Sequence, residues 1–286
     1  MTALWRQIPL PLRAVVLGVL VAAAGSYPWA WLSGANMRYL PSVPWGPLVM
    51  AAYLWLYWRY TTGRGWPAAT SPARRESARV RRVDASVWPL AIVAGIVGLW
   101  FSVSLLALIG RFVAISNPVA PDASRLSPLT ILAFVLMGAL VAGVVEEIAF
   151  RGYMQGPLER RYGPTAAIVI VGILFGLAHG SHTYWTLAMI PYYVAVAAVY
   201  GGLAYLTDSV LPSLVLHAGG DALDGLMSVG GAGNVAQQAA AQHGGRPGGA
   251  GLAVNLVVLA ATGAATLWAY RELARATSTA RSSAPA

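Results

Sequence analysis

Residues 128–153 have the sequence PLTILAFVLMGALVAGVVEEIAFRGY, in which eighteen uncharged residues precede two adjacent glutamates and a nearby arginine. A helix needs roughly 20 apolar residues to cross the hydrocarbon core of a bilayer, so this stretch predicts a membrane span over residues 128–150. Charged side chains inside such a span are costly and usually mark a functional site. The stretch therefore predicts a membrane helix and a chemically active position near its end.

Similar apolar segments occur along the whole chain. The predicted spans are residues 12–33, 43–58, 87–110, 128–150, 164–181, 184–206, 209–229 and 251–270. Because helices satisfy their own backbone hydrogen bonds in lipid, we expect an all-α, multispan transmembrane bundle of about eight spans. We divide the chain into N-terminal transmembrane helices with an arginine-rich loop (1–127), a core that carries the charged spans (128–229), and a glycine-rich loop with the last helix and tail (230–286).

The composition agrees with a membrane protein and excludes other classes. Of the 286 residues, 57% are apolar and 10% are charged, whereas soluble domains carry about 25% charged residues. The same apolar excess excludes a disordered chain. Because the chain has no cysteine, it has no disulfide framework, thiolate metal site or cysteine nucleophile. The net charge of +9 is not accompanied by a soluble domain, so we expect no nucleic-acid partner.

All 19 basic residues are arginine, and their distribution predicts the topology. Fifteen lie in the N-terminus, the even-numbered loops and the tail, and four lie in the odd-numbered loops (Arg38, Arg111, Arg125 and Arg246). By the positive-inside rule, this asymmetry places both termini in the cytoplasm. The absence of lysine beside abundant alanine, glycine and arginine suggests a G+C-rich bacterial genome, and hence a bacterial plasma membrane.

Two loops differ from the rest in composition. Residues 59–86 carry seven arginines and are predicted to lie on anionic lipid, with docking of a partner as the alternative. Residues 230–251 are rich in glycine and alanine, which predicts a flexible loop in which His243 is solvated. The lipid bilayer is therefore an expected partner, and no sequence feature specifies an oligomeric state.

Ionisable residues inside the predicted spans gather in three of them. They are Glu146 and Glu147 (followed by Arg151) in the fourth span, His179 at the end of the fifth, and His217, Asp221 and Asp224 in the seventh. Any one of these residues alone more often makes a polar contact between neighbouring helices or forms part of a salt bridge. Their concentration in otherwise apolar spans predicts a functional site.

Helix geometry predicts which of these side chains meet. Gly163-Pro164 is a strong helix stop, which predicts a hairpin between the fourth and fifth spans. Glu146 lies 17 residues before Gly163 and His179 lies 16 after it. At about 1.5 Å per residue the two side chains reach similar depth.

Residues four apart share one face of a helix. Glu147 and Arg151 have this spacing, and a buried charge needs a partner, so we expect them to pair. Glu146 points about 100° away and is left for other chemistry. His217 and Asp221 have the same spacing, and Asp224 either joins their face or lies at the membrane interface.

A glutamate with two histidines and an aspartate suits two kinds of chemistry. The set activates water by general base catalysis, or it binds a divalent metal such as zinc with an open position for water. Both lead to hydrolysis. Other intramembrane protease designs fit less well, because the chain has no H-E-x-x-H motif and both intramembrane aspartates lie on one span.

Three motifs resemble those of the CPBP family, which comprises CAAX-type prenyl endopeptidases, their bacterial relatives and bacteriocin-processing or self-immunity (Abi) proteins. Residues 146–151 (EEIAFR) resemble its E-E-x-x-x-R motif, residues 175–179 (FGLAH) its F-x-x-x-H motif, and residues 217–221 (HAGGD) its H-x-x-x-N motif. The three motifs occur in the family's order, each on its own span, and the resemblance covers residues 128–225.

The resemblance implies an intramembrane endopeptidase that cuts membrane-associated peptides or proteins near the cytoplasmic side. By it, Glu146 is the general base assisted by His179, Arg151 holds the Glu147 side of the site, and His217 and Asp221 stabilise the oxyanion or bind a metal. The implied catalytic residues are Glu146, Glu147, Arg151, His179, His217 and Asp221. If one divalent ion such as zinc is bound, its implied ligands are Glu146, His179, His217 and Asp221.

Asp221 departs from the family pattern, which has asparagine as the better-known residue at this position. An ionised aspartate cannot donate a hydrogen bond to an oxyanion. Asp221 is therefore protonated, ligates a cation, or orients His217.

The sequence is also compatible with two other functions. A non-catalytic immunity or scaffold protein of the same family keeps the same motifs, and an ion-coupled transporter also uses buried carboxylates. Transporters usually show internal repeats and broken helices. Here only the seventh span carries break signals, at Pro212 and Gly219-Gly220.

Overall fold

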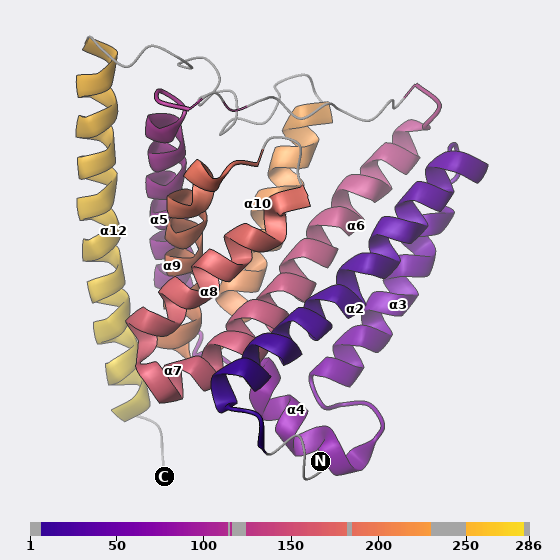
Figure 1. Cartoon of the computed structure of the whole chain (residues 1–286), viewed down its shortest axis with the longest axis horizontal. Coiled ribbons are helices and arrows are strands. Elements are labelled where there is room, and N and C mark those ends of the chain that lie inside the picture. Colours follow the sequence, from indigo (N-terminus) through magenta and orange to yellow (C-terminus); the bar gives the residue numbers. More distant parts are fainter. Residues whose placement is uncertain (1–6, 114, 116–123, 182–184, 230–249, 283–286) are drawn as a thin grey trace.

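The computed structural model describes residues 7–113, 115, 124–181, 185–229 and 250–282, which contain helices and turns but no strand (Figure 1). The predicted all-α fold is confirmed. The helices are α2 (Leu10–Tyr39), α3 (Trp45–Thr61), α4 (Ser71–Ala78), α5 (Trp88–Ile109), α6 (Pro128–Glu146), a π-helix (Glu147–Gln155), α7 (Gly156–Tyr162), α8 (Pro164–Ala178), α9 (Ile190–Thr207), α10 (Leu211–Val229) and α12 (Ala250–Ser282), with short 3₁₀ turns at Ala68–Thr70, His179–Ser181 and Leu187–Met189.

The chain is a helical membrane bundle. Within the described residues, five helical stretches are long and apolar enough to cross a membrane, namely Leu10–Tyr39, Trp88–Ile109, Pro128–Tyr162, Leu187–Thr207 and Gly251–Ala280. The other three predicted spans correspond to α3, the shorter apolar α8, and α10. Large apolar side chains such as Trp31, Trp100 and Val257 are exposed on the outer helices. A surrounding bilayer explains this exposure, since soluble monomers rarely show so much apolar surface.

Local sequence sets the helix ends near the charged motif. α6 begins where the Ser127 hydroxyl accepts a hydrogen bond from the Thr130 backbone N–H at 3.2 Å, with Pro128 in the first turn. α7 ends at Tyr162, the following Gly163 has a φ of +79° that favours glycine, and Pro164 starts α8. The predicted helix stop at Gly163-Pro164 is confirmed.

The helix that carries the two glutamates changes its geometry at the charged motif. α6 ends at Glu146, and the next nine residues form a π-helix before α7 continues the same helical run. π-Helices are rare and frequently occur at functional sites. The α-helical spacing assumed from sequence is therefore wrong for this segment, in which every residue is buried.

Small residues bring the motif-bearing helices into close contact. α10 packs on α6, and α8 packs on α9 (Figure 1). A Cβ placed on Gly143 of α6 would lie 2.7 Å from the Cβ of Ala218 on α10, so nothing larger than glycine fits there without a shift. Gly172 and Gly176 form a GxxxG pair against α9, where a Cβ on Gly176 would lie 3.1 Å from that of Tyr193.

α10 is continuous from Leu211 to Val229. Its Gly219-Gly220 pair lies inside the helix and Pro212 lies in its first turn, where proline is tolerated. The break expected from these residues is therefore absent from α10.

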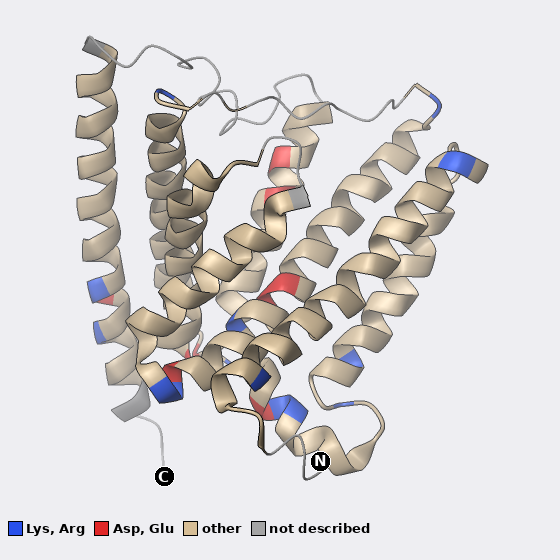
Figure 2. Ribbon diagram, viewed as in Figure 1, with Lys and Arg blue, Asp and Glu red and all other residues tan. Residues whose placement is uncertain are grey.

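Charged residues concentrate at one end of the bundle, where α2 begins and α12 ends (Figure 2). We call this the arginine-rich end, because it contains residues 59–82 with their seven arginines. Because α2 begins and α12 ends at this same end of the bundle, the arrangement agrees with an even number of membrane crossings. Its assignment to the cytoplasm stays a prediction.

The arginine-rich loop folds onto the protein. Residues 71–78 form α4, and the Arg74 and Arg79 side chains are buried, whereas Arg75 is exposed. Arg74 and Arg79 are therefore held by the protein itself, and the predicted contact of this loop with anionic lipid stays a prediction. Buried guanidinium groups need fixed acceptors, which nearby backbone carbonyls and the carboxylates of Glu159 and Asp208 provide. The predicted glycine-rich loop, including His243, lies outside the described residues except at its end.

Candidate active site

A cluster of ionisable side chains lies where the π-helix meets α10. The Nδ1 of His217 is 2.9 Å from Oε1 of Glu147. Its Nε2 is 3.6 Å from Oδ2 of Asp221 and 3.8 Å from Oε2 of Glu146. One imidazole therefore lies among three carboxylates from three helical segments. We call these four residues the His217 cluster, and all four were predicted site residues.

Glu147 and Arg151 form the closed side of this cluster. Oε1 of Glu147 is 3.2 Å from Nη1 of Arg151, and both side chains are 0% exposed. The predicted pair is confirmed, although it lies on a π-helix. The guanidinium also lies over the rings of Phe175 and Tyr200, with its central carbon 4.6 Å and 5.3 Å from their centroids. Because a buried charge without a partner is strongly destabilising, this pair fixes the Glu147 carboxylate.

The orientation of His217 follows from these contacts. A carboxylate paired with arginine accepts hydrogen bonds, so Nδ1 of His217 donates to Glu147. The imidazole also stacks on Tyr200, with centroids 4.9 Å apart and an interplanar angle of 13°. These two contacts fix the ring and direct Nε2 toward Glu146 and Asp221.

The other side of the cluster is open. The Glu146 side chain is 22% exposed and that of Asp221 is 48% exposed. Separations of 3.6 and 3.8 Å exceed hydrogen-bond length. Nε2 of His217 therefore makes no direct hydrogen bond to either carboxylate.

His179 lies just beyond the end of α8, next to the aromatic side of the cluster. Its Nδ1 is 2.8 Å from the carbonyl oxygen of Phe175, and its ring lies 4.5 Å from that of Phe175 and 4.8 Å from that of Tyr193. Phe175 in turn contacts Arg151. These contacts connect His179 to the closed side of the His217 cluster. The predicted facing of His179 and Glu146 stays a prediction.

Sequence reasoning missed two tyrosines that contact the two histidines. Tyr193 packs on His179 and Tyr200 stacks on His217. The two tyrosines are seven residues apart on α9, a spacing that puts them on the same face of a helix. This spacing of two tyrosines on one helix face was the sequence signal that could have indicated their contact with the histidines.

A metal centre has no complete ligand set in this arrangement. Across the part of the chain that the structure describes, no three His, Cys, Asp or Glu side chains are arranged to hold a metal ion. One nitrogen of His217 is already engaged by Glu147. We therefore derive no step through a metal, and the predicted zinc role of Glu146, His179, His217 and Asp221 stays a prediction.

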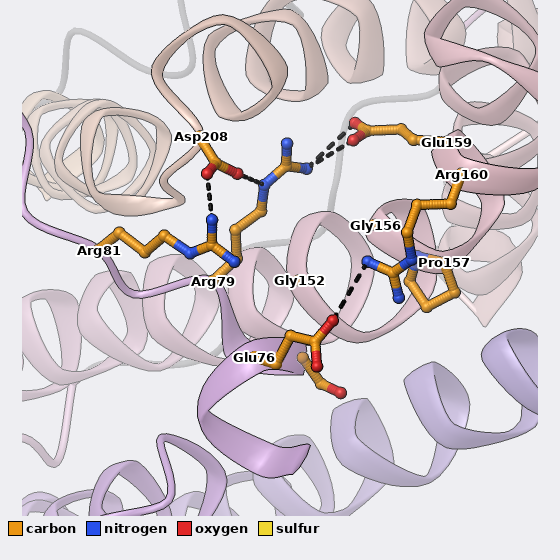
Figure 3. A pocket seen from close by; sticks show the side chains of 10 residues that line it. Glu76, Arg79, Arg81, Gly152, Gly156, Pro157, Glu159, Arg160 and Asp208 are labelled. Atoms are coloured by element: carbon orange, nitrogen blue, oxygen red, sulfur yellow. Dashed lines mark hydrogen bonds and ion pairs between the residues drawn. The ribbon is translucent and has the colours of Figure 1, made fainter. Parts of the chain in front are cut away.

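A separate polar cavity of about 250 Å³ lies beside the π-helix at the arginine-rich end. Nη1 of Arg79 lies 2.9 Å from Oε2 of Glu159, and its Nε lies 3.1 Å from Oδ1 of Asp208, which also pairs with Arg81 (Figure 3). No residue of the His217 cluster lines this cavity. Its paired charges join the arginine-rich loop to the ends of α7 and α9, which is a structural role.

Comparison with known families agrees with the motifs. Residues 128–223 match the family model described as Rce1-like, type II CAAX prenyl endopeptidase Rce1-like. The match spans 96 of the 286 residues and contains all six predicted catalytic residues. Comparisons with curated proteins and with solved structures gave no match. The resemblance predicted from the three motifs is confirmed for this segment.

Proposed function

We propose that this chain, whose residues 128–223 belong to the Rce1-like type II CAAX prenyl endopeptidase family, is an intramembrane endopeptidase of membrane-associated substrates. The observation that carries the proposal is the position of His217. Its Nδ1 is held by the buried Glu147, and its Nε2 faces Glu146 and Asp221 on the open side. This arrangement separates groups that hold the site from groups that face a substrate.

In the proposed reaction, Glu146 takes a proton from a water molecule on the open side of the cluster. The resulting hydroxide attacks the carbonyl carbon of the scissile peptide bond. Glu146 then gives the proton to the departing amide nitrogen, so that the C–N bond breaks and the carboxylate is restored. General base catalysis of this kind typically contributes about 10²–10⁴-fold to the rate.

The oxyanion of this reaction needs a hydrogen-bond donor. Nε2 of His217 serves as that donor when the imidazole is protonated on both nitrogens. Glu147 accepts a hydrogen bond from the Nδ1–H group, and the carboxylates of Glu146 and Asp221 on the other side favour a positive ring. Asp221 contributes a negative charge 3.6 Å from Nε2 in this proposal, and its three predicted roles stay predictions.

Arg151 and Glu147 are positioning residues in this proposal, because they act through His217. His179 supports the reaction from the aromatic side, where its ring is held by Phe175 and Tyr193. The proposed assistance of His179 to the general base Glu146 is supported by the family resemblance and not by a contact between the two side chains.

The test is hydrolysis of a quenched fluorescent peptide library by purified protein in detergent or nanodiscs. We compare wild type with Glu146→Gln, His179→Ala and His217→Gln, and with Glu76→Gln as a control for loss of a carboxylate outside the cluster. Glu76 suits this purpose because its side chain is 62% exposed and lies on α4. We expect Glu146→Gln to lower turnover at least about 100-fold without a change in the unfolding temperature, and Glu76→Gln to match wild type.

Equal turnover by wild type and Glu146→Gln would contradict the proposed mechanism. Absence of hydrolysis by folded wild type across the library would favour the non-catalytic immunity or scaffold alternative. Metal analysis of the same samples tests the zinc prediction, since a stoichiometric ion lost in His217→Gln would support a ligand role.

A further inference from the structure

A large apolar groove lies away from the His217 cluster, between α2, α3 and α4. Its volume is about 930 Å³, at the upper end of the range for ligand pockets. Leu17, Leu20 and Leu56 line it, and Leu20 and Leu56 are more than half exposed. The groove therefore opens on the outer surface of α2 and α3, and in a bilayer this apolar surface would contact lipid chains.

Three of the four tyrosines that line the groove present mainly apolar surface, because their hydroxyl groups are bonded to backbone carbonyls. Tyr53 donates to the carbonyl of Ala24 at 2.6 Å, and Tyr57 donates to that of Val21 at 3.1 Å. Tyr153 donates to the carbonyl of Thr61 at 2.7 Å. The body of an occupant must therefore be apolar.

One end of the groove carries a buried cation. Arg74 lines the groove and is 6% exposed. Its Nη atoms donate to the carbonyls of Tyr60, Gly65 and Pro67, at 2.6 to 2.7 Å. No carboxylate of the described residues lies within ion-pair distance of Arg74, and its Nε has no acceptor in that part of the chain. Burial of a charge without a counter-charge is costly, so the groove lacks an anion.

The surroundings of Arg74 favour a negative ligand. Residues 59–82 carry seven arginines and one acid, Glu76, and among the described residues only two of these arginines, Arg79 and Arg81, pair with carboxylates outside the segment. The hydroxyl-bearing Thr70 and Ser77 line the groove on the same side as Arg74. A positive potential with added hydroxyl groups at the end of an apolar groove is complementary to an anionic headgroup that carries a hydrocarbon chain.

We propose that this groove binds an anionic phospholipid from the surrounding bilayer. One acyl chain lies along α2 and α3, and the phosphate lies at Arg74 beside Thr70 and Ser77. A free phosphate ion satisfies Arg74 but leaves the apolar groove unfilled, and a neutral lipid fills the groove but leaves the cation unpaired. The inference is independent of the proposed protease reaction.

The experiment measures thermal unfolding of the purified full chain with added phosphatidylglycerol, with phosphatidylcholine of the same acyl chains, and with inorganic phosphate. We expect phosphatidylglycerol to raise the unfolding temperature by about 5 °C at saturation, since a ligand that binds only the folded state stabilises it. We expect no comparable rise with phosphatidylcholine or phosphate.

Two pairs of variants locate the effect. Arg74→Gln removes the cation, and its control Arg75→Gln removes an exposed arginine next to it. Ala24→Phe fills the groove, and its control Ala51→Phe adds the same ring at an exposed position of α3 that does not line the groove. We expect Arg74→Gln and Ala24→Phe to lose the phosphatidylglycerol shift and both controls to keep it.

Equal shifts with the two lipids in wild type would overturn the proposal, as would a full shift from inorganic phosphate alone. A full shift in Ala24→Phe would also overturn it. If Arg74→Gln does not fold, Ala24→Phe and its control decide the question, because Arg74 is intact in both. No step measures peptide hydrolysis, so this result does not depend on the proposed function.

Discussion

Glu146 and Glu147 are adjacent in the sequence but lie in opposite surroundings. Glu147 is 0% exposed, pairs with Arg151 and accepts from Nδ1 of His217. Glu146 is 22% exposed and lies 3.8 Å from the other nitrogen of the same imidazole. One carboxylate therefore holds the histidine from the closed side, and the other faces the open side, where the proposed reaction places the substrate. In the proposed function, the same chemical group therefore has a structural task where it is buried and a chemical one where it is exposed.

The transition from α6 to the π-helix occurs between these two residues, since Glu146 ends the α-helix and Glu147 begins the π-helix. The closed side is also surrounded by the aromatic rings of Phe175 and Tyr200. If this contrast is correct, substitutions on the closed side reduce stability and those on the open side reduce mainly activity. Four predictions test the contrast, from the largest expected change in stability to the smallest.

The largest effect is expected for Arg151→Met, which leaves Glu147 buried without its cation. We expect a loss of about 3–5 kcal/mol in the free energy of unfolding, the range observed when one partner of a buried pair is removed. Thermal unfolding of purified protein in detergent measures it. The double variant Glu147→Gln/Arg151→Met should recover most of the loss, because it removes both charges. An Arg151→Met protein as stable as wild type would show that the closed side does not depend on this pair.

The next effect concerns the contact that places both glutamates against His217. In Gly143→Ala the new Cβ would lie 2.7 Å from the Cβ of Ala218, so α6 and α10 must separate. We expect a loss of about 1–3 kcal/mol, as for other overpacked positions, and lower peptide turnover. The matched control is Gly138→Ala on the same helix, where the nearest atom, on Trp29, is 3.8 Å away. Equal behaviour of the two variants would mean that this close contact is unimportant.

A smaller effect is expected at Tyr200, which supports both Arg151 and His217. Tyr200→Leu removes the stacked ring and one cation–π contact, so we expect a loss of about 1–2 kcal/mol in unfolding free energy. Tyr200→Phe keeps the ring and should stay close to wild type in the same thermal measurement. If Phe and Leu are equally destabilising, the ring contacts are not the source of stability.

The smallest change in stability is expected for Asp221→Asn, because that side chain is 48% exposed. We expect unfolding within about 0.5 kcal/mol of wild type. Hydrolysis should be retained if Asp221 only orients His217, since asparagine is the better-known residue here in the related family. Loss of hydrolysis together with a bound metal would instead identify Asp221 as a cation ligand. Metal analysis and peptide turnover, measured on one sample, separate these results.

Much of the candidate site was predictable because its signals are local. The E-E-x-x-x-R motif and the spacing of His217 and Asp221 identified the residues of the cluster. The pair of Glu147 and Arg151 followed from residues four apart that share a helical face, and this held although the segment is a π-helix. The contribution of Tyr200 was not predicted, because an aromatic residue in a membrane span is usually an ordinary packing residue.

By itself, the sequence determined the all-α membrane class, the helix stop at Gly163-Pro164 and the identity of the charged residues. These features depend on composition and on neighbours within one or two helical turns. Only the tertiary structure decided that Nδ1 of His217 bonds to Glu147, across 70 positions, and that Arg79 bonds to Asp208, across 129. Such contacts depend on how closely whole helices pack. Glycines such as Gly143 set the distance between helices, and no local sequence pattern specifies that distance.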